Sequence, residues 1–224
     1  TTLFRSFVFD CPVSNKQVRW QSKNVLNPTA FIKDGKVYLL YRAQDSTMTS
    51  RLGLAISNDG IHFVKKAAPI FYPAKDSVEK YEWRGGVEDP RIVSTEDGRY
   101  LLTYTSYDGK TARLCFALSK DLIHWEKQGP LLKSEKYLNA WSKSGAVVVE
   151  QKGDKMIAKK INGKYWMYFG DTQLFMAYSE DLLHWEALEN KESQKLVAVL
   201  NPRAGYFDSR LVEPGPFALY TKKV

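Results

Sequence analysis

Two acids, a proline and an arginine, Glu88-Asp89-Pro90-Arg91, stand directly before an apolar β-branched run. Proline has no amide hydrogen, so it suits the first residue of a strand better than the middle of one. We therefore expect a strand that enters the fold at Pro90 with charged side chains at its mouth. Carboxylates there could act as a general acid or base, and the arginine could bind an anion or hydroxyl groups. The alternative is an acid–arginine pair that only caps the strand.

A second acid stands in a similar strand opening, Glu213-Pro214-Gly215-Pro216, and Asn27-Pro28 makes a third opening. Two carboxylates facing each other across a funnel suit glycoside chemistry, in which one protonates the leaving oxygen and the other activates water. Arg42 and Asp171 each follow an apolar strand. A charged residue in that place can be a site residue or part of a surface ion pair, and the sequence does not favour either. Trp141 lies in a loop, where it could stack on a sugar or cap the core.

An internal repeat sets the organisation of the chain. A Ser-x-Asp-x-x-His-aromatic stretch ends at Phe63, Trp125 and Trp185, a spacing of roughly 60 residues, and contains all three histidines. The Asp of such a turn can hydrogen bond the turn's own backbone, and the aromatic ring can pack between sheets. We therefore expect these turns to be structural, with no catalytic histidine and no metal site.

Each repeat has the same interior. Apolar runs flank Asp34-Gly35, Asp97-Gly98 and Asn162-Gly163, which are strong hairpin signals. Another apolar run follows a polar loop, and a further strand is expected after each Ser-x-Asp turn, as at residues 63–65. Three or four short strands per repeat are typical of β-propeller blades.

The sequence thus predicts an all-β fold, a β-propeller in a single domain over residues 1–224. Repeats near 25–66, 86–128 and 143–188, with a partial one at 207–224, amount to about three and a half blades. We expect the C-terminal blades to be missing from this sequence, and residues 1–24 to form a lead-in strand that helps to close the ring. The first strand of a blade lines the central channel, and matching the repeats places four side chains there: Asn27, Asp89, roughly Lys143, and Glu213.

The composition excludes several functional classes. The net charge is +8, but the lysines are scattered and form no stripe for nucleic acid, although a phosphate-bearing ligand fits. No apolar run is long enough to span a membrane. The two cysteines match no zinc or redox motif; Cys115 reads as a buried strand residue, and a disulfide with Cys11 remains open.

The sequence resembles glycoside hydrolase family 130, the mannoside phosphorylases and β-mannosidases. The matching pieces follow one another along nearly the whole chain: Asn27-Pro28, residues 38–43 (YLLYRA), residues 86–91 (GVEDPR), residues 162–167 (NGKYWM) and residues 208–216 (DSRLVEPGP). The resemblance implies a five-bladed propeller. It also implies that Asp89 is the general acid, that the proton passes through a sugar hydroxyl, and that the product is inverted at the anomeric carbon.

The family's phosphorylases hold phosphate with basic residues, and this chain offers Arg42, Arg91, Lys143 and Arg210. Where those phosphorylases have a basic residue after the Tyr-Trp-Met strand, this chain has Tyr168-Phe169-Gly170-Asp171. An acid there resembles the hydrolytic branch, which acts on β-1,2-mannosides. A carboxylate there would also repel phosphate, which supports hydrolysis. Asp171 or Glu213 would then be the base that activates water.

We therefore predict an inverting glycosidase that hydrolyses β-mannosides, with a mannoside phosphorylase releasing mannose 1-phosphate, or a non-catalytic carbohydrate-binding propeller, as alternatives. No cofactor or metal is expected, apart from inorganic phosphate as co-substrate of a phosphorylase. The partner is an oligosaccharide, and a homo-oligomer is compatible with the sequence. A hydrolase would suit the periplasm or exterior of a bacterium, and a phosphorylase the cytoplasm. The expected catalytic residues are Asp89, Glu213 and Asp171, and the expected substrate-binding residues are Asn27, Arg42, Asp45, Glu88, Arg91, Trp141, Lys143, Asp208 and Arg210.

Overall fold

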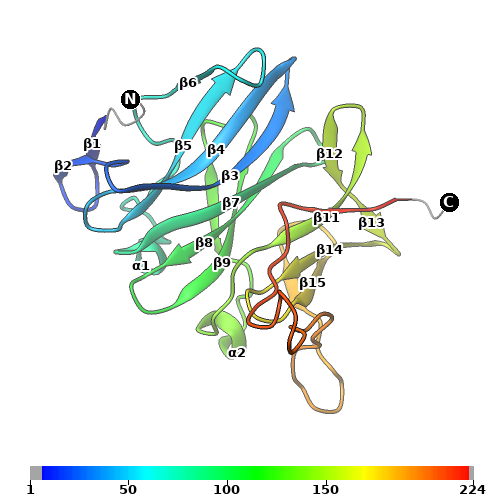
Figure 1. The fold of residues 1–224 in the computed structure, drawn as a ribbon. Helices are drawn as coiled ribbons and strands as arrows, with labels where there is room; N and C mark the ends of the chain where they lie inside the picture. The colour runs from blue at the N-terminus through cyan, green and yellow to red at the C-terminus, as the bar shows by residue number, and fades with distance from the viewer. Residues whose placement is uncertain (1–6, 222–224) are drawn as a thin grey trace.

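The computed structural model describes residues 7–221, and it is an all-β structure (Figure 1). One branched sheet holds fifteen strands, and a separate hairpin holds two. The helices among the described residues are single turns, α1 (Glu79–Glu82) and α2 (Glu135–Leu138). Each of them lies in the connection that leads from one repeat to the next. The predicted all-β class is therefore confirmed.

The first repeat forms a four-stranded antiparallel meander. Asp34 and Gly35 both have positive φ angles, 51° and 70°, the pairing that a tight two-residue hairpin requires. Apolar side chains then alternate along the strands, so that one face packs into the core. The four strands are β3 (Asn24–Lys33), β4 (Lys36–Gln44), β5 (Ser50–Ser57) and β6 (Phe63–Lys65).

The second repeat has the same plan and is the most deeply buried of the three. Every residue of its third strand is buried, and Gly98 (φ 82°) lies in the turn between its first two strands. Its strands are β7 (Gly86–Ser94), β8 (Tyr100–Tyr107), β9 (Ala112–Ser119) and β10 (Glu126–Pro130).

The third repeat departs from the prediction in one place. An extra hairpin, turning at Gly153 (φ 63°), extends the first strand beyond Val148 before the chain reaches the predicted Asn162-Gly163 turn. This hairpin was not predicted because its turn, Gly153-Asp154, has Gly and Asp in the reverse of the expected order. The strands are β11 (Ala146–Lys152), β12 (Lys155–Ala158), β13 (Lys160–Ile161), β14 (Lys164–Phe169), β15 (Phe175–Ser179) and β16 (Trp185–Ala187).

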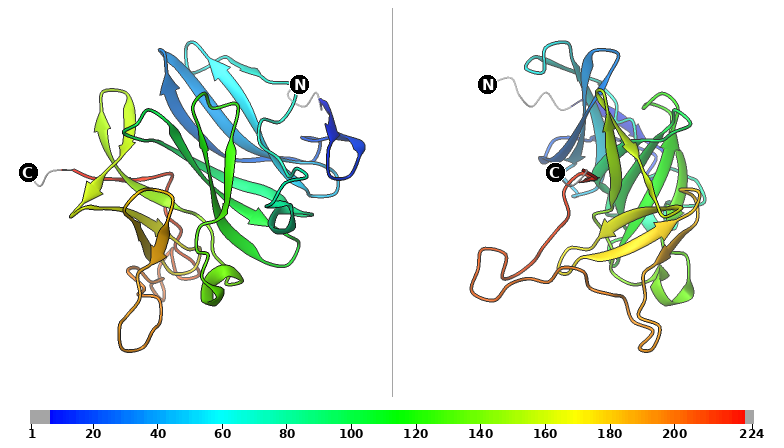
Figure 2. Two further views of the ribbon diagram at one scale, coloured as in Figure 1. Left: turned by 180° about the vertical axis from the view of Figure 1, so that it is seen from behind. Right: turned by 90° about the vertical axis from the view of Figure 1, so that its right-hand side faces the viewer.

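The meanders are joined through β7, the first strand of the second one. β7 pairs in parallel with β5 at Ser50 and Gly86, and with β12 at Ser94 and Ile157. A Cβ at Gly86 would lie 2.1 Å from the Ser50 carbonyl oxygen, and its φ is 100°, so this junction requires glycine. The strands of residues 7–221 do not close into a ring (Figure 2). The propeller and its number of blades remain predictions.

The hydrophobic core lies between neighbouring meanders. One cluster joins Leu40 and Leu54 of the first meander to Leu102 of the second. A second cluster joins Phe116 of the second meander to Met167 of the third. Each meander therefore packs against the next one, as face-packed sheets do.

The Ser-x-Asp-x-x-His turns are structural, as predicted. In the second turn, Asp121 Oδ1 accepts hydrogen bonds from the amides of Ile123 and His124, and Oδ2 lies 2.6 Å from His124 Nδ1. The His124 side chain is 85% exposed. The hydrogen bond from the histidine is the largest of the causes that lower the pKa of Asp121 below its ordinary value. The other two turns repeat these contacts at Asp59 and Asp181.

Residues before the first meander form a hairpin, β1 (Val8–Cys11) and β2 (Lys16–Arg19), instead of the predicted lead-in strand. It is separate from the large sheet, and the fully buried Trp20 that follows it donates Nε1 to the Ala67 carbonyl. Cys11 and Cys115 are both buried and free, so a disulfide between them is excluded.

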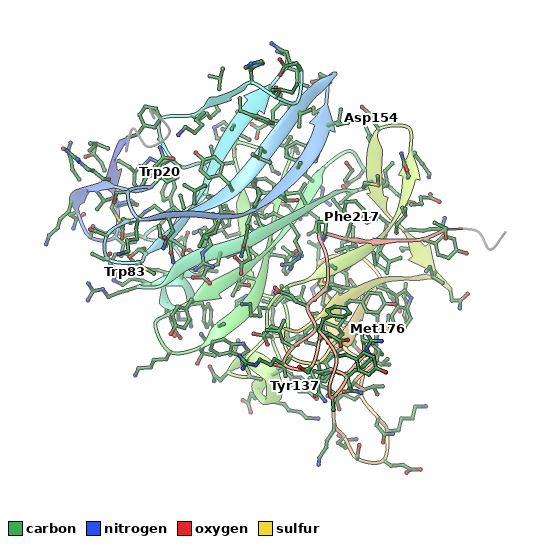
Figure 3. The ribbon with its side chains drawn as sticks, in the orientation of Figure 1. Trp20, Trp83, Tyr137, Asp154, Met176 and Phe217 are labelled. Atoms are coloured by element: carbon green, nitrogen blue, oxygen red, sulfur yellow. The ribbon has the colours of Figure 1, made fainter. Side chains whose placement is uncertain are left out.

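The predicted fourth repeat is represented by one short strand. Residues 201–217 form an extended loop that projects from the body (Figure 2). The chain then turns at Phe217, labelled in Figure 3, into β17 (Ala218–Leu219), which runs parallel to β11. No helix within residues 7–221 is long and apolar enough to cross a membrane.

Candidate active site

Asp89 lies on a bulge in β7. The register of β7 against β8 shifts between Glu88 and Arg91, and Asp89 has φ 50°, a left-handed conformation uncommon outside glycine. Pro90 has no amide hydrogen, so the bulge leaves one fewer backbone donor without a partner. The residue is 5% exposed. The local sequence thus turns this carboxylate out of the ordinary strand alternation.

Asn27 occupies the corresponding bulge of the first repeat. β3 changes register between Leu26 and Thr29, and Asn27, which precedes Pro28, has φ 43°. Its Nδ2 donates to Asp89 Oδ1 at 2.6 Å. The structure therefore brings these two side chains into contact, as the matching of the repeats predicts.

Arg42, from β4, joins the two acids. It donates from Nη1 to Asp89 Oδ1 at 3.1 Å, from Nη2 to Glu88 Oε1 at 2.6 Å, and from Nε to Ser50 Oγ at 3.0 Å. The Ser50 hydroxyl in turn donates to Glu88 Oε1 at 3.1 Å. All of these side chains are largely buried, so the fork of the guanidinium fixes both carboxylates.

Burial raises the pKa of Glu88 above its ordinary value, and the nearby charge of Asp89 raises it further. The Arg42 guanidinium opposes this shift. Glu88 and Asp89 are thus two neighbouring acids in one partly desolvated place with a shared cation.

Arg91 connects this strand to the loop that carries Glu213. Its Nη2 lies 3.3 Å from Glu213 Oε1 and donates to the Pro214 carbonyl at 3.0 Å, while Nε donates to the Gly215 carbonyl at 3.0 Å. Ser144 Oγ also donates to Glu213 Oε1. Burial lowers the pKa of Arg91 from its ordinary value, and Glu213 counteracts that effect. Glu213 is therefore held against β7 by two side chains.

Lys143 lies between two carboxylates. Its Nζ is 3.8 Å from Asp89 Oδ2 and 4.0 Å from Asp171 Oδ2. The indole Nε1 of Trp141 donates to the same Asp171 oxygen at 3.0 Å. The Lys143 carbonyl accepts a hydrogen bond from the Gly170 amide, which joins this segment to the end of β14.

The predicted equivalence of Lys143 with Asn27 and Asp89 is off by one residue. Ser144 has φ 59°, which matches the left-handed backbone of the other two, although it lies two residues before its strand begins whereas they lie within theirs. Gly145 follows Ser144, whereas a proline follows each of the other two residues. The repeats are matched by that proline, so the third repeat is matched one residue too early. Lys143 nonetheless reaches Asp89 because its side chain is long.

Three predicted binding residues lie outside this cluster. Asp45 is 4% exposed; its Oδ2 accepts from Arg51 at 2.7 Å, and its Oδ1 accepts from Thr47. It is therefore a structural acid of the β4–β5 turn. Asp208 pairs with Arg203 at 2.9 Å in the projecting loop, where Arg210 is exposed.

Ser50 and Ser144 are site residues that the sequence analysis missed. Each donates its hydroxyl to a glutamate of the cluster, Glu88 and Glu213 respectively. A serine inside an otherwise unremarkable strand opening gives little signal. The place of Ser144, one residue before the start of a repeat, could have identified it.

Two hollows lie beside the pair of acids, one lined by Glu88 and the other by Asp89. One has a volume of about 440 Å³ and is lined by Arg42, Glu88, Lys143 and Trp141, among others. The other, of about 310 Å³, is lined by Asn27, Asp89, Arg91 and Glu213, together with the prolines beside them. A third opening, of about 340 Å³ and more apolar, is lined in part by Phe217 and by none of these carboxylates. The cluster therefore presents acids to two adjacent concave surfaces.

Among residues 7–221, no group of three or more His, Cys, Asp and Glu side chains could hold a metal ion. The carboxylates of the cluster are instead matched by cations of the protein. Such an arrangement can transfer protons to and from a bound ligand and can hydrogen bond its hydroxyl groups.

Comparison with known proteins places these features in context. Residues 4–223 match a family model described as beta-1,4-mannooligosaccharide phosphorylase. Over 177 residues the chain is 33% identical to a 1,2-beta-oligomannan phosphorylase of Thermoanaerobacter sp. (strain X514), a match that covers 74% of this chain and 53% of the relative.

Solved structures show the same fold. A glycosyl hydrolase from Bacteroides ovatus is 43% identical, with a TM-score of 0.92 over 96% of this chain and 62% of its own. Another, also 43% identical with a TM-score of 0.94, covers 97% of this chain and 63% of its own. It is described by the statement that the family of mannoside phosphorylases contains glycoside hydrolases that target beta-1,2 mannosidic linkages in Candida mannan. The chain thus spans about half the length of the curated relative and less than two thirds of these structures.

Proposed function

The chain belongs to glycoside hydrolase family 130, and from that premise we propose that it hydrolyses β-1,2-linked mannosides with inversion at the anomeric carbon. The observation that carries the choice of water as acceptor is the charge pairing of the cluster. Arg42, Arg91 and Lys143 each lie within 4.0 Å of a carboxylate, so all three cations are already engaged. A phosphate dianion entering this cluster would meet Asp89, Asp171 and Glu213, and like charges repel.

In this reaction Asp89 supplies the proton that the leaving oxygen needs, directly or through a sugar hydroxyl. Asn27 and Arg42 hold its Oδ1, which leaves Oδ2 as the oxygen that faces Lys143. The carboxyl group is therefore fixed in position before substrate binds, which is what general acid catalysis requires.

We assign Glu213 as the base, because Glu213 and Asp89 line the same hollow. Ser144 and Arg91 hold Oε1 of Glu213 and orient the other oxygen. In the proposed step, Glu213 takes a proton from water as the water oxygen bonds to the anomeric carbon. The bond to the leaving oxygen breaks, and that oxygen receives the proton that originates at Asp89. The products are α-mannose and the shortened glycan, as expected for attack from the opposite face.

Phosphorolysis is the second candidate, and the comparisons favour it by name. Both the family description and the Thermoanaerobacter relative are phosphorylases. One structural observation also agrees: Arg84 is exposed in the wall of the larger hollow, and no ion pair involves it among the described residues. A phosphate bound there would attack the same carbon and give α-mannose 1-phosphate.

The test is to incubate the protein with β-1,2-mannobiose in a buffer without phosphate and in one with about 10 mM phosphate, a concentration above typical KM values. The products are then separated. Free mannose at equal rates in both supports hydrolysis. Mannose 1-phosphate that forms only with phosphate contradicts hydrolysis and establishes the second candidate. No product in either buffer contradicts both.

A further inference from the structure

The larger of the two hollows has an aromatic wall that the proposed reaction does not use. Four segments line it: the turn between β4 and β5, the residues before β7, the turn between β8 and β9, and the residues before β11. Its volume is about 440 Å³, within the range typical of small-molecule sites. The hollow reaches the catalytic cluster through Arg42, Glu88 and Lys143.

Trp141 forms part of this wall and is 56% exposed. All six tryptophans lie within the described residues, and Trp141 is the one that is exposed. Its hydrogen bond to Asp171 and its edge contact with Tyr107, at 6.4 Å between ring centroids, limit how the ring can turn. A large, oriented and exposed apolar ring beside a catalytic centre is typical of a binding surface.

Another part of the wall is formed by Gly85 and Tyr107, which pack closely against each other. A Cβ at Gly85 would lie 2.2 Å from Tyr107 Cδ1, so glycine lets the segment before β7 lie against that ring. Gly85 also accepts a hydrogen bond from the Ser50 amide, which links this wall to the Glu88 network. Arg84 and Thr47 add polar groups around the aromatic surface.

We propose that this hollow is a sugar subsite in which a mannosyl residue next to the cleaved bond stacks on Trp141. Glu88 lines this hollow and its neighbour Asp89 lines the other one, so a glycan whose cleaved bond lies over these two carboxylates can extend into both hollows. A sugar ring has an apolar face of C–H groups that an indole can cover, while its hydroxyls bond to polar groups at the rim. The choice of mannose rests on the proposed function. It follows that the preferred substrates are oligosaccharides and that Trp141 governs their affinity.

The test measures binding in the Asp89→Asn background, so that turnover does not interfere. β-1,2-Mannotriose and methyl β-mannoside are titrated by calorimetry into this protein and into its combinations with Trp141→Ala, Trp141→Phe and Trp166→Phe. Trp166 packs on Tyr178 away from the hollow, and its variant is the matched control for loss of an indole. We expect Trp141→Ala to weaken mannotriose binding about tenfold, and more than it weakens methyl mannoside binding.

The conservative variant separates stacking from support of Asp171. Trp141→Phe keeps an aromatic face but cannot donate to Asp171, so stacking predicts that it retains most of the affinity. An affinity as low as that of the alanine variant would overturn the stacking role, as would an alanine variant that binds like its parent. Binding that depends on Trp141, in a protein whose parent releases no mannose, would support the subsite and contradict hydrolysis. Release of mannose by the parent, together with binding that does not change when Trp141 is replaced, would support hydrolysis and contradict the subsite.

Discussion

Asn27 and Asp89 lie 62 residues apart, in the same place of successive repeats, and hydrogen bond directly to each other, from Nδ2 to Oδ1 at 2.6 Å. Both have left-handed backbone angles, and each precedes a proline. The first two repeats thus each supply a bulge in their first strand, and these two bulges bring their side chains together. One copy carries the acid, and the other carries an amide that holds it.

Asp89→Asn tests the role of the acid. The amide has nearly the same shape but cannot release a proton, so we expect kcat with mannobiose to fall by about 10²–10⁴-fold with little change in KM. The melting temperature of the variant shows whether the fold is kept. A variant with more than half of the parent's kcat would remove Asp89 from the reaction.

Glu213→Gln and Asp171→Asn decide between the two expected bases. Since Glu213 shares a hollow with Asp89 whereas Asp171 holds Trp141, we expect about a 10²-fold or greater loss of kcat for Glu213→Gln. Asp171→Asn should mainly raise KM. Steady-state kinetics of both variants with mannobiose check this, and the opposite ranking would make Asp171 the base.

Much of the site followed from the residue pattern, because the strand openings repeat. Hairpin turns such as Asp34-Gly35 could be predicted because the positive φ angles that they need depend on the turn residues themselves. Asp45 was misjudged because its partner Arg51 is brought to it by the strand pairing of β4 and β5. Ser144 was missed because Gly145 follows it where a proline follows both Asn27 and Asp89.

Arg51→Met should strongly destabilise the fold. Arg51 is 1% exposed and pairs with the buried Asp45, and it also reaches Cys11 Sγ of the N-terminal hairpin. Methionine would leave the Asp45 charge buried without a partner, which costs about 3–5 kcal/mol. Urea denaturation measures the change in the free energy of unfolding.

The matched control for that variant is Arg99→Met, which removes a largely exposed pair with Asp97. Exposed pairs contribute about 0–1 kcal/mol, so this variant should unfold close to the parent. Adding Asp45→Asn to Arg51→Met should recover part of the loss. Equal effects of Arg51→Met and Arg99→Met would show that the buried pair contributes no more than a surface pair.

Glu82 should make stability depend on pH. It is fully buried in α1, accepts a hydrogen bond from Tyr104 and lies 2.5 Å from Lys127, and burial raises its pKa from 4.5 to about 7. The Glu82 carboxyl group therefore binds a proton more tightly in the folded protein than in the unfolded chain. Its stabilising contribution is fully present below pH 4.5 and is lost as the pH rises towards 7.

Glu82→Gln should remove that dependence. Relative to the parent, the variant should gain free energy of unfolding between pH 4.5 and 7, by up to about 1.4 kcal/mol per pH unit. Urea titrations across this range measure the difference, with Glu79→Gln on the same helix as control. Parallel curves for parent and Glu82→Gln would contradict the raised pKa.

The most direct test of the account follows the cleavage of β-1,2-mannobiose by proton NMR in phosphate-containing buffer, in real time, with the parent and Asp89→Asn proteins. The account predicts that the α-anomer of free mannose appears first, that the β-anomer grows only by mutarotation, and that the Asp89→Asn protein gives neither on the same time scale. α-Mannose 1-phosphate as the first product would contradict water as the acceptor. β-Mannose as the first product would contradict the inverting arrangement of Asp89 and Glu213.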